Sequence, residues 1–247
     1  MDNSHPWRCF DIPIEGPSFS DLVSSISNKQ IRWIITANPE ILLHARKDKD
    51  YRDAIQKADL RIADGFGIVL MARLFGKKLH RVTGVDLAEA IMKHAAEKDW
   101  SVAFVGGGDT PGTAQKAFKA IQKRYPALRG TAHDGGRVNP DGTGDTTDDE
   151  TIQQLIQESP DIILVGFGHP KQERWIACNL PNLPSVKTII GIGGTFDYWA
   201  GNIKRAPGWM RSLGLEWLFR LVKEPKRWKR IWNAVIVFPV TALFQRW

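Results

Sequence analysis

Two segments that carry acidic, hydroxyl and amide groups lie where predicted strands end, and these groups could move a proton. Asp64 separates a predicted strand from the flexible Gly65-Phe-Gly67, and a carboxylate in this setting can act as a general base. Thr36 and Asn38 offer a hydroxyl and an amide at the end of another predicted strand. The alternative is structural in each segment, because Asp, Asn and Thr also cap the first turn of helices.

Three further segments have residue types that suit an anionic ligand. The turn 106–112 follows a predicted strand and precedes a helix, so its N–H groups could hold a phosphate; a tight turn is the alternative. Lys171, Gln172 and Arg174 begin a predicted helix and suit a diphosphate or sugar hydroxyls, unless they form a solvated charged face. The segment 191–197 is a second glycine-rich strand exit, where the backbone could approach a ligand closely.

The sequence offers no convincing ligand set for a metal ion. Its six histidines lack the spacing of metal ligands, and Cys9 and Cys178 belong to no metal-binding motif. Asp48-Lys-Asp50 lies in a charged stretch between predicted helices and is disfavoured as a metal site. We therefore expect neither a metal nor a cofactor, and the two cysteines are consistent with a reducing compartment.

Short apolar runs alternate with helical patterns along most of the chain, and these elements must position the residues above. Strands are predicted at 31–36, 60–64, 101–105, 128–133, 161–165 and 187–192. Helices are predicted at 39–47, 51–58, 66–75, 84–98, 112–124, 151–158 and 170–179, with a polar loop at 139–149. This alternation predicts an α/β protein with a Rossmann-like, mainly parallel sheet and helices on both faces.

Ligands of such sheets bind beyond the carboxyl ends of the strands. One mouth should therefore collect the residues that lie at or just past these ends: Thr36, Asp64, Gly106, Gly166 and Gly193.

Positive charge is concentrated at the C-terminal end of the chain. The net charge is +7, and residues 196–247 hold ten Lys or Arg against three Asp or Glu, with six of the ten tryptophans. We therefore divide the chain into an α/β catalytic domain, 1–195, and a basic, tryptophan-rich appendage, 196–247. Arg220, Arg227 and Arg230 have the spacing of one helix face, although Pro225 should break that helix. The appendage suits an anionic surface: a membrane, a nucleic acid or a phosphorylated substrate.

The sequence predicts a cytoplasmic protein that lies on a membrane rather than crossing it. Residues 1–16 contain acids and two prolines and lack the apolar core of a signal peptide. The longest uncharged apolar run, 231–244, has 14 residues, whereas a spanning helix needs about 20. Docking of a C-terminal helix on its own domain is the alternative to contact with lipid.

Seven motifs occur in an order that is specific as a set, although each is weak alone. They are Thr-Ala-Asn-Pro-Glu (36–40), Ala-Asp-Gly-Phe-Gly (63–67), Arg-Val-Thr-Gly-Val-Asp (81–86), Gly-His-Pro-Lys-Gln-Glu (168–173), Gly-Gly-Thr-Phe-Asp-Tyr-Trp-Ala-Gly (193–201), Lys-Arg-Ala-Pro (204–207) and Gly-Leu-Glu-Trp-Leu-Phe-Arg-Leu (214–221). Through these motifs, residues 31–230 resemble the WecG/TagA/CpsF family of bacterial glycosyltransferases.

The resemblance implies an inverting, metal-independent hexosyltransferase. Its donor would be a UDP-sugar carrying N-acetylmannosamine or glucose, and its acceptor a sugar on polyprenyl diphosphate. The product would serve the synthesis of a cell-surface polysaccharide such as an exopolysaccharide. Asp64 matches the proposed general base, and Thr36 matches a second residue of the catalytic pocket. The appendage would bring the enzyme, as a peripheral protein, to the inner face of the bacterial cell membrane and complete the active site.

The resemblance and the strand-end argument together give the expected substrate-binding residues. The arginines of the appendage are expected to reach the diphosphate. The set comprises Asn38, Arg81, Thr83, Gly106, Gly166, Lys171, Gln172, Gly193, Gly194, Asp197, Arg220, Arg227 and Arg230.

Two other functions keep a basis in the sequence. The turn 106–112, with Asp134 about 20 residues beyond its start, is compatible with a nucleotide-dependent oxidoreductase. The basic appendage is compatible with a nucleic-acid-binding protein. Against nucleic acid, the charge is confined to one end of the chain, so the expected partners are the UDP-sugar, the lipid-linked acceptor and an anionic membrane surface. Self-association of the catalytic domain into a homo-oligomer is left open.

Overall fold

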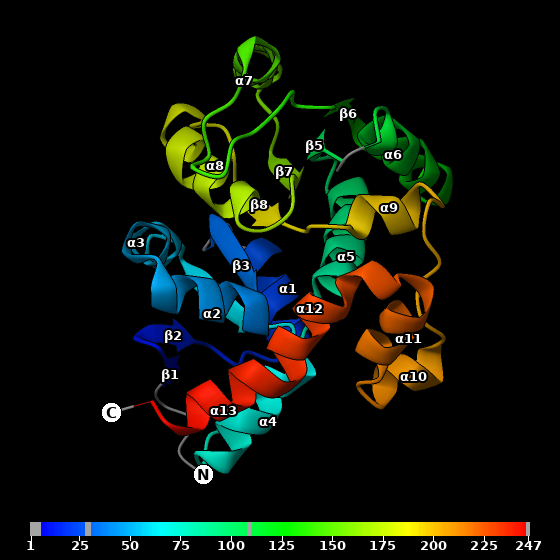
Figure 1. Cartoon of the computed structure of the whole chain (residues 1–247). Coiled ribbons are helices and arrows are strands. Elements are labelled where there is room, and N and C mark those ends of the chain that lie inside the picture. Colours follow the sequence, from blue (N-terminus) through cyan, green and yellow to red (C-terminus); the bar gives the residue numbers. More distant parts are fainter. Residues whose placement is uncertain (1–5, 28–30, 108–109, 246–247) are drawn as a thin grey trace.

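A six-stranded parallel sheet forms the centre of the molecule (Figure 1). The computed structural model describes residues 6–27, 31–107 and 110–245. The strands follow the order β4-β3-β8-β7-β5-β6, and every neighbouring pair is parallel. They are β3 (Trp33–Ala37), β4 (Leu60–Ala63), β5 (Ser101–Gly106), β6 (Arg129–His133), β7 (Ile162–Gly166) and β8 (Thr188–Gly191). The predicted Rossmann-like α/β fold is confirmed.

Helices cover both faces of the sheet because the apolar side chains of each strand alternate between two cores. Trp33 and Ile35 belong to the first core, whereas Ile34 belongs to the second. The first core is covered by α2 (Pro39–Lys47), α3 (Lys49–Gln56), α4 (Phe66–Leu74), α7 (Thr146–Glu158) and α8 (Lys171–Asn179), with the turn η1 (Leu180–Asn182) after α8. The second is covered by α1 (Phe19–Ser27), α5 (Gly84–Glu97), α6 (Thr113–Arg124) and α9 (Thr195–Trp199).

The first elements of the chain were not predicted from the sequence. Strands β1 (Trp7–Cys9) and β2 (Ile12–Ile14) form an antiparallel hairpin. Phe10 and Asp11 make its turn with φ angles of 51° and 64°, the combination that a tight two-residue hairpin requires. Each strand has only three residues, which is too short for an alternating pattern to stand out. Helix α1 follows and packs on the second core.

The predicted polar loop at 139–149 is wrong in its second half. Helix α7 begins at Thr146 rather than at residue 151. Asp145 caps it, because its side chain accepts a hydrogen bond from the N–H of Asp148 at 3.2 Å. Asp148 is buried and accepts a bond from Trp175 Nε1 at 2.7 Å. The acidic stretch is therefore the first turn of a helix.

The C-terminal segment is a chain of short helical pieces that crosses the body from the sheet toward the β1–β2 hairpin (Figure 1). The expected break at Pro225 is confirmed, since Glu224 before it has φ −130° and ψ 72°. No helix in the described part of the chain is both long and apolar enough to span a bilayer. Arg246 and Trp247, which we counted in the appendage, lie outside the described residues. The pieces are α10 (Gly208–Ser212), α11 (Glu216–Lys223), η2 (Pro225–Arg227), α12 (Trp228–Trp232), the π-turn η3 (Asn233–Val237) and α13 (Phe238–Leu243).

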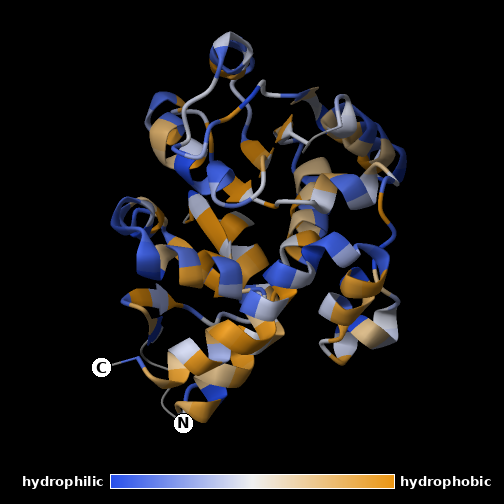
Figure 2. Ribbon diagram, in the orientation of Figure 1, coloured by the Kyte–Doolittle hydropathy of each residue, from blue (hydrophilic) through white to orange (hydrophobic). Residues whose placement is uncertain are grey.

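Both ends of the proposed appendage pack on the body. Phe196 lies in the second core, where its ring stacks on Phe104 with centroids 4.8 Å apart. At the far end, Phe238 and Ala242 of α13 lie in the first core. The apolar residues of α13 and α4 lie beside one another (Figure 2). Docking of the tail on its own domain is thus what the structure shows.

Phe238 should anchor the tail to the body. Its side chain is fully buried, so Phe238→Ala is expected to lower the free energy of unfolding by about 3–5 kcal/mol, the cost typical of such a cavity. Val240→Ala on the same helix, at a side chain 51% exposed, should change it by less than about 0.5 kcal/mol. Urea unfolding of both variants measures the difference. Equal stabilities would show that α13 does not dock as described.

Candidate active site

Asp64 lies at the carboxyl end of β4, at the edge where β3 and β8 also end. Its N–H donates to the carbonyl of Ala37 at 2.9 Å, which extends the pairing of the two strands by one residue. Burial raises the pKa of its carboxyl group to about 6, against the opposing effects of the Arg81 guanidinium and the N–H of Gly84. A carboxyl group with this pKa is ionised at neutral pH and can still accept a proton readily.

Arg81 connects this strand end to the appendage. Its Nε donates to the carbonyl oxygen of Asp64 at 3.0 Å, and its Nη1 donates to the carbonyl of Arg211 at 2.8 Å. Its Nη2 lies 3.9 Å from Glu216 Oε2 on α11. The guanidinium thus contacts the backbone of the candidate base and helices α10 and α11 at the same time.

The structural alternatives hold for two residues near Asp64. Asn38 Oδ1 caps α2 by accepting from Glu40 and Ile41 at 2.9 and 3.0 Å. Thr83 Oγ1 caps α5 by accepting from the N–H of Asp86 at 3.2 Å. These contacts orient the first turns of α2 and α5 toward the mouth, and they give both residues a structural function whatever else they bind.

Thr36 is buried at the end of β3, and its hydroxyl faces the neighbouring strand. Oγ1 donates to the carbonyl of Gly191 in β8 at 3.3 Å. A Cβ at position 84 would lie 3.3 Å from the Thr36 side chain, a tight contact that glycine avoids where α5 starts beside β3. The sheet therefore brings Thr36 and Asp64 to one edge, as expected for neighbouring parallel strands.

A chain of buried hydrogen bonds fixes the backbone just after β8. Gln172 Oε1 accepts from the N–H of Gly193 at 3.0 Å, and Gln172 Nε2 donates to Glu173 Oε1 at 2.7 Å. Glu173 is 2% exposed, and its Oε2 lies 3.3 Å from His169 Nδ1. Because Glu173 accepts from the Gln172 amide, the carbonyl oxygen of Gln172 must point toward Gly193. The space around Gly193 is empty, and the atoms nearest a Cβ at Gly194 would be Asp197 Oδ2 and Arg220 Nη2.

Two other residues predicted at this edge have different surroundings. Lys171 is half-buried in the first turn of α8 and has no hydrogen bond or ion pair within the described residues. Asp197 accepts a hydrogen bond from Asn202 at 3.1 Å. Lys171 thus keeps its charge available to a ligand, whereas one oxygen of Asp197 is already occupied.

The glycines at the ends of β5 and β7 are explained by packing. Gly106 and Gly166 are register partners, and a Cβ at Gly166 would come within 2.6 Å of the Phe196 ring. At Gly106 a Cβ would lie 3.0 Å from Phe167. The rings of Phe167 and Phe196 therefore occupy the space beside these glycines where a ligand was expected from the sequence.

Asp134 occupies the helix end that the turn 106–112 was expected to offer to a phosphate. Both of its carboxylate oxygens lie 3.1 Å from the N–H of Gly112, the cap of α6. Gly108 and Asp109 of this turn lie outside the described residues. A carboxylate at this N–H competes with a phosphate, so the tight-turn alternative is favoured over a dinucleotide site.

Arg220 reaches the mouth from α11. Its Nε donates to the hydroxyl of Tyr198 at 2.6 Å, its Nη2 bonds the same oxygen, and its guanidinium lies 5.1 Å from the centroid of that ring. Its charge also lowers the pKa of Asp64, after the larger effects of Arg81 and Gly84. Tyr198 thus holds Arg220 over the exit of β8.

Arg227 and Arg230 gather beside Arg220, and each has an ion pair. Arg227 pairs with Glu224 at 2.7 Å, and Arg230 makes two bonds to Glu40 at 2.7 and 2.6 Å. Burial, then the neighbouring Arg220 and Arg230, lower the pKa of Arg227. The three arginines therefore form one cationic cluster near the mouth. The carboxylates of Glu224 and Glu40 bind Arg227 and Arg230 in the way that an anionic ligand would.

Four residues of this arrangement were missed: Glu40, Glu173, Tyr198 and Glu216. Each stands inside a motif noted in the sequence, in which another residue was selected. Arg230, the partner of Glu40, lies 190 positions away in the chain, and the arginines beside Tyr198 and Glu216 also belong to other motifs. Glu173 differs, because its partners His169 and Gln172 stand in its own motif. In the part of the chain that the structure describes, no three His, Cys, Asp or Glu side chains form a metal site.

Asp64 should cost stability at neutral pH. Its pKa of about 6 exceeds the ordinary value of 3.8, so the folded state binds the proton more tightly and stability falls as pH rises from about 4 to 6. We expect Asp64→Asn to be about 1–3 kcal/mol more stable than the parent chain at pH 7, with the difference vanishing near pH 4. Denaturant unfolding at both pH values measures it, with the exposed Asp50→Asn as control. A constant difference would refute the raised pKa.

Comparison with known proteins places the chain in a family. The model of the glycosyl transferase WecG/TagA/CpsF family matches residues 7–247. An N-acetylglucosaminyldiphosphoundecaprenol N-acetyl-beta-D-mannosaminyltransferase of Bacillus subtilis is 34% identical over 201 residues, 80% of this chain and 74% of that protein. A protein of the same name from Staphylococcus aureus is 35% identical over 200 residues, 81% of this chain and 74% of that protein. The chain therefore belongs to the WecG/TagA/CpsF family of glycosyltransferases.

Proposed function

We propose that this chain is an inverting glycosyltransferase that moves a hexose from a UDP-sugar to a sugar carried on polyprenyl diphosphate. The observation that carries the proposal is the carboxyl group of Asp64, which burial gives a pKa of about 6 at the edge where β3, β4 and β8 end. The names of the relatives support a diphosphate-linked N-acetylglucosamine as acceptor and N-acetylmannosamine as the transferred sugar. Glucose stays the second candidate for the donor.

In the proposed reaction, an acceptor hydroxyl attacks the anomeric carbon of the donor while its proton passes to Asp64. The new glycosidic bond forms as the bond to UDP breaks, and attack from the face opposite UDP inverts the configuration. The base is strongest in this role when it is ionised and poorly solvated, which is how Asp64 is placed.

The departing UDP gains negative charge on its diphosphate, and cationic and N–H groups at the mouth can stabilise it. Arg220 and the backbone of Gly194 lie at the exit of β8, beside Gln172 and Gly193. We propose that these groups, rather than a metal ion, balance the charge. Thr36, closer to Asp64, would contact the reacting sugars.

Arg227 and Arg230 would serve the diphosphate of the lipid-linked acceptor. In the structure their guanidinium groups bind Glu224 and Glu40. A diphosphate has the same bidentate geometry as a carboxylate and more charge, so it can replace these partners. Because Arg230 is about half exposed, its pair with Glu40 contributes little stability, and its release would cost little.

We further propose that the appendage places the enzyme on the inner face of the bacterial cell membrane. Residues 196–247 contain ten Lys or Arg and three Asp or Glu. Each basic residue near an anionic bilayer contributes about 1 kcal/mol to the free energy of membrane binding. Trp209, Trp228 and Trp232 are exposed, as expected for side chains of the interfacial layer. The product would enter the synthesis of a cell-surface polysaccharide.

The pH dependence of transfer tests the base. Only the ionised carboxylate accepts a proton, so kcat/KM should rise about tenfold per unit below pH 6 and level off above it. Asp64→Asn should fold normally and lose about 10²–10⁴-fold in rate at pH 7.5. Steady-state UDP release measures both. Near-normal turnover in the variant would remove Asp64 as the base.

A donor panel tests the reaction itself. UDP release should depend on a short-chain polyprenyl-diphosphate-linked N-acetylglucosamine and should occur with UDP-N-acetylmannosamine, with UDP-glucose as the competing donor and UDP-N-acetylglucosamine as the control. Release without acceptor would indicate hydrolysis only. Silence of the folded protein across the panel, with lipid present and acceptors varied, would contradict the proposed function.

A further inference from the structure

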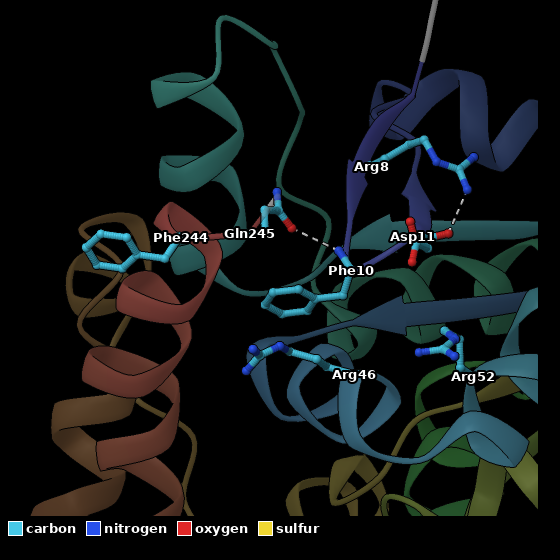
Figure 3. A pocket seen from close by; sticks show the side chains of 7 residues that line it. All are labelled: Arg8, Phe10, Asp11, Arg46, Arg52, Phe244 and Gln245. Atoms are coloured by element: carbon cyan, nitrogen blue, oxygen red, sulfur yellow. Dashed lines mark hydrogen bonds between the residues drawn. The ribbon is translucent and has the colours of Figure 1, made fainter. Parts of the chain in front are cut away.

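A cationic pocket lies outside the candidate active site, between the β1–β2 turn, helices α2 and α3, and the end of α13 (Figure 3). Its volume is ≈ 500 Å³. A hydrogen bond of 3.0 Å from the N–H of Phe10 to Gln245 Oε1 connects the turn to the end of α13. It is lined by Arg8, Phe10, Asp11, Arg46, Arg52, Phe244 and Gln245.

The positive charge of this pocket is not balanced by the protein. Arg8 donates only to the backbone carbonyl of Asp11 at 2.8 Å, and Arg52 only to that of Ala45 at 3.3 Å. Arg46 lies over the Phe10 ring at 5.6 Å. Within the described residues none of the three forms an ion pair, although Arg227 and Arg230 at the active site both do. The pocket therefore has three guanidinium groups and one carboxylate in its lining, and this excess of positive charge can bind a phosphate.

An exposed apolar edge adjoins the pocket. Phe244, which lines it, is 81% exposed, and Val240 and Leu243 precede it on α13. Helix α4 lies beside α13 (Figure 2), and it exposes Leu70 and Leu74. Several exposed apolar side chains on two neighbouring helices are unusual on a soluble surface and typical of a membrane contact.

We propose that the pocket binds the phosphate group of an anionic phospholipid while the exposed side chains of α13 and α4 enter the acyl layer. Charge favours this occupant. An anionic lipid carries a phosphate next to apolar chains, and the cationic pocket lies next to exposed apolar side chains in the same way. The inference rests on the proposed membrane association and deepens it. It assigns lipid recognition to arginines outside the appendage, Arg8, Arg46 and Arg52.

This contact would orient the enzyme. Arg220 on α11 lies at the candidate active site, and Gln245 after α13 lines the pocket. Lipid bound at the far end would lay α12 and α13 along the bilayer and turn the cationic cluster of Arg227 and Arg230 toward a lipid-linked acceptor. The proposed headgroup site and the mouth would then face the same membrane.

Vesicle co-sedimentation of the full chain tests the inference. The triple variant Arg8→Gln, Arg46→Gln, Arg52→Gln is compared with Lys116→Gln, Lys119→Gln, Lys123→Gln, which removes the same charge from the exposed face of α6. On vesicles of phosphatidylglycerol and phosphatidylcholine, we expect the arginine variant to bind at least about tenfold more weakly and the lysine variant to change less than about threefold. Equal binding of the two variants would overturn the assignment of the pocket.

Two further measurements separate the remaining outcomes. Phe244→Ser should weaken vesicle binding by itself, whereas binding of soluble glycerophosphoglycerol that equals vesicle binding would overturn the lipid proposal in favour of a small soluble anion. Thermal unfolding and transfer to a short-chain, water-soluble acceptor serve as folding controls, and both should be unchanged in the arginine variant. Absence of vesicle binding by the unaltered chain, with transfer retained, would refute the membrane contact and leave the glycosyltransferase standing.

Discussion

The carboxylate of Asp64 has to stay available for a proton while burial opposes its charge, and most of the structure around it serves this balance. Parallel pairing brings the ends of β3, β4 and β8 together and takes solvent away from the side chain. Arg81 and the N–H of Gly84 stabilise the ionised carboxylate and so lower its pKa again in part. Without the burial the carboxyl group would be a weaker base, and without the guanidinium it would be protonated at higher pH.

The appendage belongs to this balance because it supplies charges of both signs. Arg220 lowers the pKa of Asp64, whereas Glu216 on the same helix raises it. The two ends of the appendage are held by apolar packing, at Phe196 and at Phe238. Between them it also makes polar contacts near the mouth, such as the 2.6 Å pair between Arg205 and Asp86. Charged groups can exchange partners with a ligand at modest cost, and a fully buried ring cannot. Helices α10 to α12 could therefore adjust to a substrate while α13 stays docked.

Residues whose signal is local were predictable from the sequence. Most of the six strands are apolar runs, although β6 is not, and parallel pairing alone implies that Thr36, Asp64 and Gly193 meet at one edge. The hairpin of three-residue strands and the acidic start of α7 gave no such signal. Long-range partners could not be predicted at all: Glu40 was read only as part of a motif, yet it binds Arg230, and Tyr198 holds Arg220. Gly166 needs the absence of a Cβ for packing against Phe196, which no local pattern distinguishes from a ligand site.

The most direct measurement is the pKa of the Asp64 side chain in the full-length protein. Carbon-13 NMR of the aspartate carboxyl carbons, with Asp64→Asn to assign the signal, follows this group alone through a pH titration. The opposition of burial and guanidinium charge predicts a midpoint of about 6. A midpoint at or below the ordinary 3.8 would show that the carboxylate is solvated or fully paired, and would contradict its role as the base of this site.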